Sequence, residues 1–468
     1  MDFQTIKENI ILKEGIKYFD CAASGLAYRP IEEEIERVLA TYANVHSAGG
    51  ANAEITSDYY ENARAKIKKL LGCEERYYLI SCGFGATAAI KKLWEILGIY
   101  LPPATRDRLG LRRESLKQLP LFIISPFEHH SVEISLRQGL CEVVRVPLDP
   151  SGLMDFARLG EILSENKGRE IYGVLTAASN VTGLKLDYKR AYLMLKAHGG
   201  RLFVDASALI AHENVDLGFC DGVFFGAHKL LGGVGASGIL AVRKELLRGE
   251  EPTFAGGGTI KYADALTQRF IIDKERLEEA GTPGIIALVR TYLALKLRKS
   301  VGLEAIKSRE EAICRRFISE ISKIPEIEIY GNLTAPRVPI FAFNMQGVGP
   351  DALAGVLGQK FEIQTRAGCD CAASYGFDLL GLQPDTEMSR KPAWVRASFS
   401  FIHDESDVDL IVAFDKQAIK DPFLHFFDFK YSLEDLFRKE VDLMEEQPVR
   451  NAYLRKNIEN SKVLIYER

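Results

Sequence analysis

Short apolar runs alternate with amphipathic stretches along the first half of the chain. Apolar residues recur at helical spacing in residues 31–40 and 57–71. The runs that read as strands are 77–81, 121–125, 141–148, 171–179, 201–207, 222–227 and 238–243. Short apolar strands that alternate with helices are typical of a mostly parallel sheet with helices on both faces. The pattern therefore predicts an α/β fold.

The pattern changes after Gly284. A long apolar stretch, "IIALVRTYLALKLRKSVG", predicts a helix that leads into a smaller α+β domain. We place the large domain at 46–290 and the small domain at 291–415. The polar stretch 101–119 reads as a loop-like insertion, and the aromatic and charged tail, 416–468, as a C-terminal helical extension. We find no internal repeat.

Composition excludes several classes of protein. The chain has 468 residues, 47% hydrophobic and 26% charged, with a net charge of −4. These values are ordinary for a soluble globular protein, and the net negative charge does not indicate a basic surface that would bind nucleic acid. No apolar run reaches the ~20 residues that span a bilayer, and the N-terminus lacks a signal-peptide core. We expect a cytoplasmic protein with neither a membrane nor a nucleic acid as partner.

Cysteine usage indicates neither disulfides nor a zinc site. The eight cysteines are scattered, which is not a disulfide framework in a chain of this length. Only Cys369 and Cys371 are close together, and their C-x-C spacing is too tight for the usual zinc half-site. The adjacent His129 and His130 are a weak metal candidate because neighbouring side chains diverge. We expect no metal.

Polar residues gather just past the predicted strands, where ligands bind in open α/β sheets. "GFGAT" follows 77–81 and opens a helix, so its backbone N–H groups favour a phosphate, with Thr87 adding a hydroxyl. The side chains that follow the other strands are Glu128, His129 and His130, then Asn180, Asp205, His228 and Lys229. Together they offer a phosphate cradle, an imidazole, an amide, a carboxylate and an amine at one rim.

Each of these residues alone has an ordinary structural explanation. Glycines serve turns, Asp205 is in place to cap a helix, Asn180 suits a turn, and Lys229 suits a solvated loop. Their convergence on one rim is what favours a site. A binding module without catalysis stays as an alternative.

A nicotinamide enzyme is a further alternative. Gly83, Gly85 and Ala88 match the G-x-G-x-x-A dinucleotide fingerprint between a strand and a helix. The acidic residue expected roughly 20 positions later would be Asp107, inside the polar insertion rather than at a strand end. This mismatch weakens the NAD interpretation.

The order of motifs resembles the class V aminotransferase superfamily of fold type I pyridoxal phosphate enzymes. It is most similar to the cysteine desulfurase and selenocysteine lyase branch, over roughly residues 15–415. The matching stretches are "YFDCAASG" (18–25), "NVHSAGG" (44–50), "GATAAI" (85–90), "EHHS" (128–131), "SNVTG" (179–183), "VDAS" (204–207), "AHKLLGG" (227–233), "GGGT" (256–259), "AGTPG" (280–284), "RAGCDCA" (366–372) and "WVRASFSFIHDESDVD" (394–409).

The resemblance implies the cofactor pyridoxal 5'-phosphate and roles for residues around its ring. Lys229 would form the Schiff base, and a desolvated amine suits that role. Asp205 would pair with the pyridinium nitrogen, so that the ring acts as an electron sink. His129 would stack on the ring, and Asn180 would bond near the ring oxygen.

The resemblance also implies phosphate and substrate contacts. Arg396, helped by Arg366, would bind the substrate carboxylate in a fork geometry. Thr282 would reach the phosphate from the partner subunit of a homodimer with shared active sites, and residues 1–45 would pack on the small domain. The remaining residues implied for cofactor binding are Gly85, Ala86, Thr87, Ser207 and His228.

Cys371 aligns with the nucleophilic cysteine of one group of desulfurases, although it also suits a small buried position. This alignment implies conversion of L-cysteine to L-alanine with a persulfide on Cys371. It also implies a sulfur-acceptor protein as a further partner. Two departures set the chain apart: Ala208 stands where relatives usually have glutamine, and Gly226 where they usually have serine. Transamination and β-elimination, which need the same cofactor but not Cys371, stay open.

Overall fold

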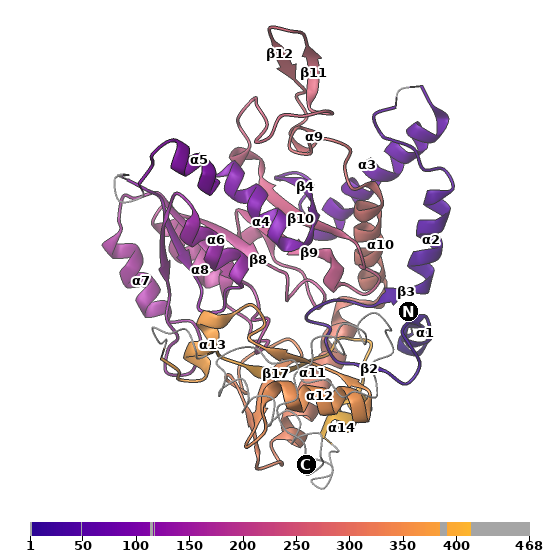
Figure 1. The fold of residues 1–468 in the computed structure, drawn as a ribbon, viewed down its shortest axis with the longest axis vertical. Helices are drawn as coiled ribbons and strands as arrows, with labels where there is room; N and C mark the ends of the chain where they lie inside the picture. Colours follow the sequence, from indigo (N-terminus) through magenta and orange to yellow (C-terminus); the bar gives the residue numbers. More distant parts are fainter. Residues whose placement is uncertain (1, 48, 113–115, 117, 384–390, 413–468) are drawn as a thin grey trace, which may run out of the picture. The chain divides into compact units, whose positions relative to one another are not determined.

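The central element of the fold is a seven-stranded sheet in the order β4-β10-β9-β8-β7-β5-β6 (Figure 1). Strand β10 alone runs opposite in direction to the other six strands. The prediction of a mostly parallel sheet is therefore confirmed. The strands are β4 (Tyr77–Phe84), β5 (Leu121–Ile124), β6 (Glu142–Arg145), β7 (Ile171–Thr176), β8 (Arg201–Asp205), β9 (Gly222–Gly226) and β10 (Ser237–Arg243). The computed structural model describes residues 2–47, 49–112, 116, 118–383 and 391–412.

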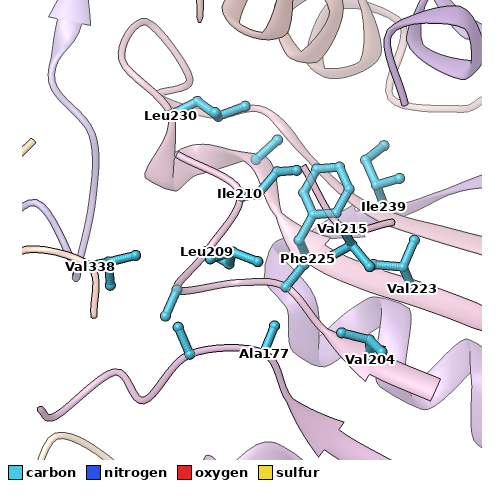
Figure 2. Close-up of a cluster of buried hydrophobic side chains, with 14 of the residues drawn as sticks. Ala177, Val204, Leu209, Ile210, Val215, Val223, Phe225, Leu230, Ile239 and Val338 are labelled. Carbon is cyan, nitrogen blue, oxygen red and sulfur yellow. The ribbon is translucent and has the colours of Figure 1, made fainter. Parts of the chain in front are cut away.

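Helices cover both faces of this sheet because successive strand residues point to opposite sides. Ile80, Phe122 and Phe203 pack against α4 (Gly85–Ile96) and α6 (His130–Gln138). The alternate residues pack against the opposite helices, and Figure 2 shows part of that cluster around Phe225 and Val204. The helices of this second face are α3 (Ala51–Leu71), α7 (Phe156–Glu165), α8 (Tyr188–Ala197) and α10 (Ile285–Val301).

A smaller antiparallel sheet, in the order β13-β14-β17-β16, follows α10. It contributes two strands to the site described below, β16 (Arg366–Gly368) and β17 (Trp394–Ser398). The other elements of this part are α11 (Leu303–Ile321), β13 (Ile327–Ile329), β14 (Ile340–Met345), α12 (Pro350–Phe361), β15 (Ile363–Gln364), α13 (Ala373–Leu379) and α14 (Glu405–Val412).

The N-terminal segment contacts this smaller part. Strand β2 (Lys17–Tyr18) pairs in parallel with β15, and Asp20 bridges to Ser398 on β17. All of the described residues belong to one compact unit, and the domain boundaries predicted above stay predictions. The predicted extension 416–468 lies outside the described residues. The other elements of the N-terminal segment are α1 (Phe3–Glu8), β1 (Ile10–Ile11), β3 (Ala27–Tyr28) and α2 (Arg29–Leu39).

Three details differ from the sequence-based expectation. Helix α3 begins at Ala51 rather than 57, because Gly50 ends the preceding loop and Ala53 and Thr56 add to the buried face. The polar stretch 101–119 contains a short helix, α5 (Pro103–Arg108), which Pro103 can begin since it needs no N–H partner there. A hairpin of β11 (Ile260–Ala263) and β12 (Gln268–Phe270) projects from the body and is followed by α9 (Lys274–Leu277) (Figure 1).

Within the ranges that the structure describes, no helix combines the length and apolarity needed to cross a bilayer.

Candidate active site

A cavity of about 230 Å³ opens at the carboxyl ends of the parallel strands. It is lined by residues that follow β5, β7, β8 and β9, by the start of α4, and by β16 and β17 of the smaller sheet. Every residue to which the resemblance assigned a cofactor, catalytic or substrate role lines it except Thr282. These residues are Gly85, Ala86, Thr87, His129, Asn180, Asp205, Ser207, His228, Lys229, Arg366, Cys371 and Arg396.

Lys229 lies in a single turn of 3-10 helix, Ala227–Lys229, directly after β9. Burial lowers the pKa of its amine to about 8; the charges of Arg396 and Arg366 act in the same direction, and that of Asp205 opposes them. An appreciable share of the amine is therefore unprotonated near neutral pH. A neutral amine is the form that adds to a carbonyl or accepts a proton.

Asp205 is the last residue of β8 and is almost fully buried. Its carboxylate accepts a hydrogen bond of 2.8 Å from the backbone N–H of Ser207. Burial raises the pKa of this carboxyl, while the bonds from Ser207 and the charge of Lys229 act against that rise. A buried carboxylate beside a cavity is suited to pair with a cationic ring nitrogen.

Glu128, a rim residue to which the sequence assigned no role, joins the ends of β5 and β7. Its carboxyl accepts hydrogen bonds from Thr176 N at 2.8 Å and Thr176 Oγ1 at 2.9 Å, and from the hydroxyl of Ser125. Thr176 in turn is the register partner of Asp205. Burial raises the pKa of Glu128 to about 8, and the nearby charge of Asp205 contributes. The feature of the sequence that could have indicated a role for Glu128 is its position in the matching stretch "EHHS".

His129 caps α6. Its Nδ1 accepts a hydrogen bond of 3.0 Å from Ser131 N, which assigns the ring proton to Nε2. Burial, together with the charge of Lys229, lowers the pKa of the imidazole to about 4, so the ring is neutral at physiological pH. The ring lines the cavity as a flat, uncharged wall.

The N-terminus of α4 forms an anion cradle at one end of the cavity. Gly83 and Gly85 have φ of 76° and 69°, conformations that glycine adopts readily, and the first residues of α4, whose N–H groups have no partner within the helix, line the cavity. Thr87 Oγ1 lies 2.7 Å from Ser131 Oγ. Opposite, a Cβ on Gly226 would lie 2.6 Å from Cε1 of His228. The ring of His228 thus occupies space that a serine at position 226 would need.

Arg396 is not free. Its guanidinium lies 2.8 Å from Asp20 Oδ1 and 3.2 Å from Asp370 Oδ1, and donates to the Asn180 carbonyl at 3.0 Å. Arg366 also reaches Asp370 Oδ1, at 3.0 Å. Two carboxylates thus already contact the predicted substrate clamp, and the sequence gives no sign of this because Asp20 and Asp370 are far apart in it.

Cys371 follows β16 in a loop that is fastened on several sides. Its carbonyl accepts a bond of 2.7 Å from His130 N, and the Asp370 carbonyl accepts one of 2.7 Å from Asn180 Nδ2. Trp394 Nε1 donates to Asp370 Oδ2 at 2.6 Å. Cys371 lines the cavity, whereas Cys369 packs against the apolar core. The two thiols of the C-x-C pair therefore have different surroundings.

Two residues from the sequence analysis lie elsewhere. Thr282 accepts a hydrogen bond of 3.1 Å from Asn44 Nδ2 and lines a separate hollow with Cys82 and Phe254. Its role at a partner's site stays a prediction. Asp107, the residue the dinucleotide interpretation needs, is exposed on α5 and pairs with Arg106. Among the described residues, no group of His, Cys, Asp or Glu is placed to hold a metal ion.

The fold and the cavity define an α/β enzyme with an amine, a buried carboxylate and an anion cradle at one sheet edge. The family model of aminotransferase class V matches residues 17–411. The chain belongs to the aminotransferase class-V family. A second model, polymerase beta nucleotidyltransferase, matches residues 399–468, most of which lie outside the described ranges.

Curated relatives cover most of the chain. A probable cysteine desulfurase of Pyrococcus abyssi is 25% identical over 426 residues, which is 89% of this chain and 98% of that protein. A cysteine desulfurase of Salmonella newport is 28% identical over 413 residues, 85% of this chain and 92% of that protein.

Solved structures share the fold. An apo cysteine desulfurase from Thermococcus onnurineus superposes with a TM-score of 0.75 at 22% identity, covering 89% of this chain and 98% of that one. The cysteine desulfurase CsdA from Escherichia coli gives a TM-score of 0.72 at 24% identity, covering 91% and 99%.

Proposed function

We propose that the protein is a pyridoxal phosphate-dependent cysteine desulfurase that converts L-cysteine to L-alanine and leaves a persulfide on Cys371. The observation that supports this most is the single cavity that brings together Lys229, Asp205, Arg396 and Cys371. The named relatives point to the same reaction.

The residues of the cavity fit the cofactor. The amide oxygen of Asn180 is buried without a hydrogen-bond partner and lines the cavity. A buried polar atom without a partner is costly, and a polar group of a ligand would satisfy it. Ser207 Oγ also lacks a bond of good geometry, although it is close enough to favour the charge of Asp205.

The cofactor would be held at both ends. The backbone at Gly85 and Ala86, with Thr87 and His228, would bind the phosphate, and Asp205 would pair with the ring nitrogen while His129 lies on the ring face. Lys229 would hold it covalently. When bound, the cofactor supplies an electron sink for the bonds at the substrate Cα.

The chain's own residues then supply positioning and proton transfer. The guanidinium of Arg396 binds the substrate carboxylate, which orients Cα toward Lys229. Lys229 Nζ accepts the Cα proton, as its lowered pKa allows. Cys371 Sγ forms a bond to the substrate sulfur while the Cβ–S bond breaks, and Cβ gains a proton. Alanine and the Cys371 persulfide are the products.

We further propose a homodimer in which Thr282 completes the phosphate site of the partner subunit. Large apolar side chains are exposed near Thr282 and on the projecting hairpin, as expected of a surface that another subunit covers: Phe254 is 71% exposed and Leu266 is 96% exposed. A sulfur-acceptor protein would remove the persulfide sulfur.

Product analysis after incubation with L-cysteine tests the proposal, with the native protein beside Cys371→Ser and Lys229→Ala. We expect alanine and sulfide from the native protein in the presence of a thiol reductant, and neither product in quantity from the two variants. Pyruvate with sulfide, undiminished in Cys371→Ser, would instead establish a β-eliminating lyase.

A further inference from the structure

The arginine pair at the substrate end of the cavity already holds a carboxylate from the chain itself. Asp370 Oδ1 lies 3.0 Å from Arg366 Nε and 3.2 Å from Arg396 Nη1. The side chain of Asp370 is fully buried and lines the cavity. Oδ1 makes these contacts without well-directed hydrogen bonds, so the attraction is mainly one of charge.

A count of charges shows why a substrate carboxylate must compete with Asp370. Arg366 and Arg396 contribute two positive charges, and Asp20 and Asp370 contribute two negative ones. A further carboxylate bound to this neutral group would leave an excess negative charge beside the buried side chains of Arg396 and Asp370, which is unfavourable even though Arg366 is partly exposed. One of the resident carboxylates therefore has to move away when an amino acid binds.

Asp370 is the one placed to move. Asp20 does not line the cavity, and its backbone is bridged to Ser398 of β17. Asp370 and Cys371 have φ of 50° and 57°, and hydrogen bonds from Trp394 Nε1, Asn180 Nδ2 and His130 N hold them there. Two consecutive non-glycine residues in the left-handed region are uncommon, and such a conformation persists only where surrounding contacts hold it.

We propose that Asp370 is the resident anion of the substrate-carboxylate subsite, and that an incoming amino-acid carboxylate replaces it on Arg366 and Arg396 and so frees the loop of Cys371. Binding of the substrate and exposure of the reactive thiol are then coupled. Asp370 acts as a specificity-determining and positioning residue, because ligands without a carboxylate cannot displace it. The proposal rests on the proposed function, since it assumes an amino-acid substrate at this cavity.

The test measures alkylation of Cys371 by iodoacetamide in the purified holoenzyme, followed by peptide mass spectrometry. L-Alanine is the probe, L-alaninamide is the matched ligand without a carboxylate, and Cys82, a half-buried thiol outside this loop, is the reference. We expect saturating L-alanine to speed alkylation of Cys371 by about fivefold or more. We expect L-alaninamide to have no such effect.

Asp370→Asn keeps the shape and an acceptor for Trp394 but removes the competing charge. We expect faster alkylation of Cys371 without ligand and about tenfold tighter binding of L-alanine, because the subsite no longer has to be vacated. Asp378→Asn is the matched control: Asp378 lies on α13, the substitution breaks its ion pair with Arg145 of β6, and the variant should behave as the native protein does.

The proposal is overturned if L-alanine slows or does not change alkylation of Cys371 in the native protein, or if Asp370→Asn binds L-alanine no more tightly. The native measurement needs no variant, so a folding defect in Asp370→Asn does not remove the test. Failure of the desulfurase proposal has a different signature: L-alanine would speed alkylation, but no alanine would form from L-cysteine.

Discussion

Glu128 gives the most quantitative prediction. Replacing it with alanine leaves the buried backbone N–H of Thr176 without its partner at 2.8 Å, and removes the acceptor of the Thr176 and Ser125 hydroxyls. An unpaired buried donor costs about 1–3 kcal/mol, and each further hydrogen bond about 1 kcal/mol. We therefore expect Glu128→Ala to lose about 3–5 kcal/mol of unfolding free energy in urea.

Glu128→Gln separates this hydrogen bonding from the charge. The amide oxygen still accepts from Thr176 N, and the amide N–H₂ donates to a hydroxyl as a protonated carboxyl would. At pH 6 we expect Glu128→Gln to lose less than about 1 kcal/mol of unfolding free energy. A loss in Glu128→Gln as large as in Glu128→Ala, or a loss below about 1 kcal/mol in both, would refute the reasoning.

The same pair of proteins has a predicted pH dependence. The pKa of Glu128 rises from 4.5 to about 8 on folding, so the folded state retains a proton that the unfolded state releases. The stabilising effect is complete below the unfolded pKa and is lost as the pH rises toward 8. Glu128→Gln cannot titrate at this position. As the pH rises from about 4.5 to about 8, its unfolding free energy should therefore increase relative to that of the native protein, by at most about 1.4 kcal/mol per pH unit. A pH-independent difference would contradict the assignment.

Three further predictions concern the cavity. Gly226→Ser should weaken cofactor binding, measured by absorbance titration, because its Cβ would lie 2.6 Å from His228 Cε1; unchanged affinity would show that the ring moves freely. Asp205→Asn should lower the pKa of Lys229 below about 8, seen as an acid shift in the pH dependence of Lys229 labelling in cofactor-free protein, and should abolish turnover; an alkaline shift would refute this. His129→Phe should keep cofactor binding within a few-fold yet lose about 1 kcal/mol of unfolding free energy in urea with the α6 cap, and an unchanged stability would show that the cap contributes nothing.

Much of the fold was predictable because strands and helices differ in apolar periodicity. The residues at the strand ends could also be predicted. In a parallel sheet, polar residues that directly follow apolar strands, such as Asp205 and Lys229, lie at the same edge of the sheet. What the sequence could not provide were the contacts across long separations. Asp20 and Asp370 meet at Arg396 because Asp20 bridges to Ser398 on β17 and because β16, which precedes Asp370, pairs with β17.

The short helix α5 and the hairpin β11–β12 were missed for a different reason. Both are made of mixed polar residues without a buried face, so no hydrophobic period indicates them. The early start of α3 was missed because Ala53 and Thr56 are small or polar, yet both are buried.

The measurement that tests the central claim most directly is the mass of the peptide that contains Cys371 after brief incubation of the protein with L-cysteine and rapid acid quenching. We predict that this peptide gains the mass of one sulfur atom, at Cys371 and not at Cys369, and that one alanine appears for each sulfur bound. Formation of alanine or pyruvate with Cys371 unmodified throughout would contradict it.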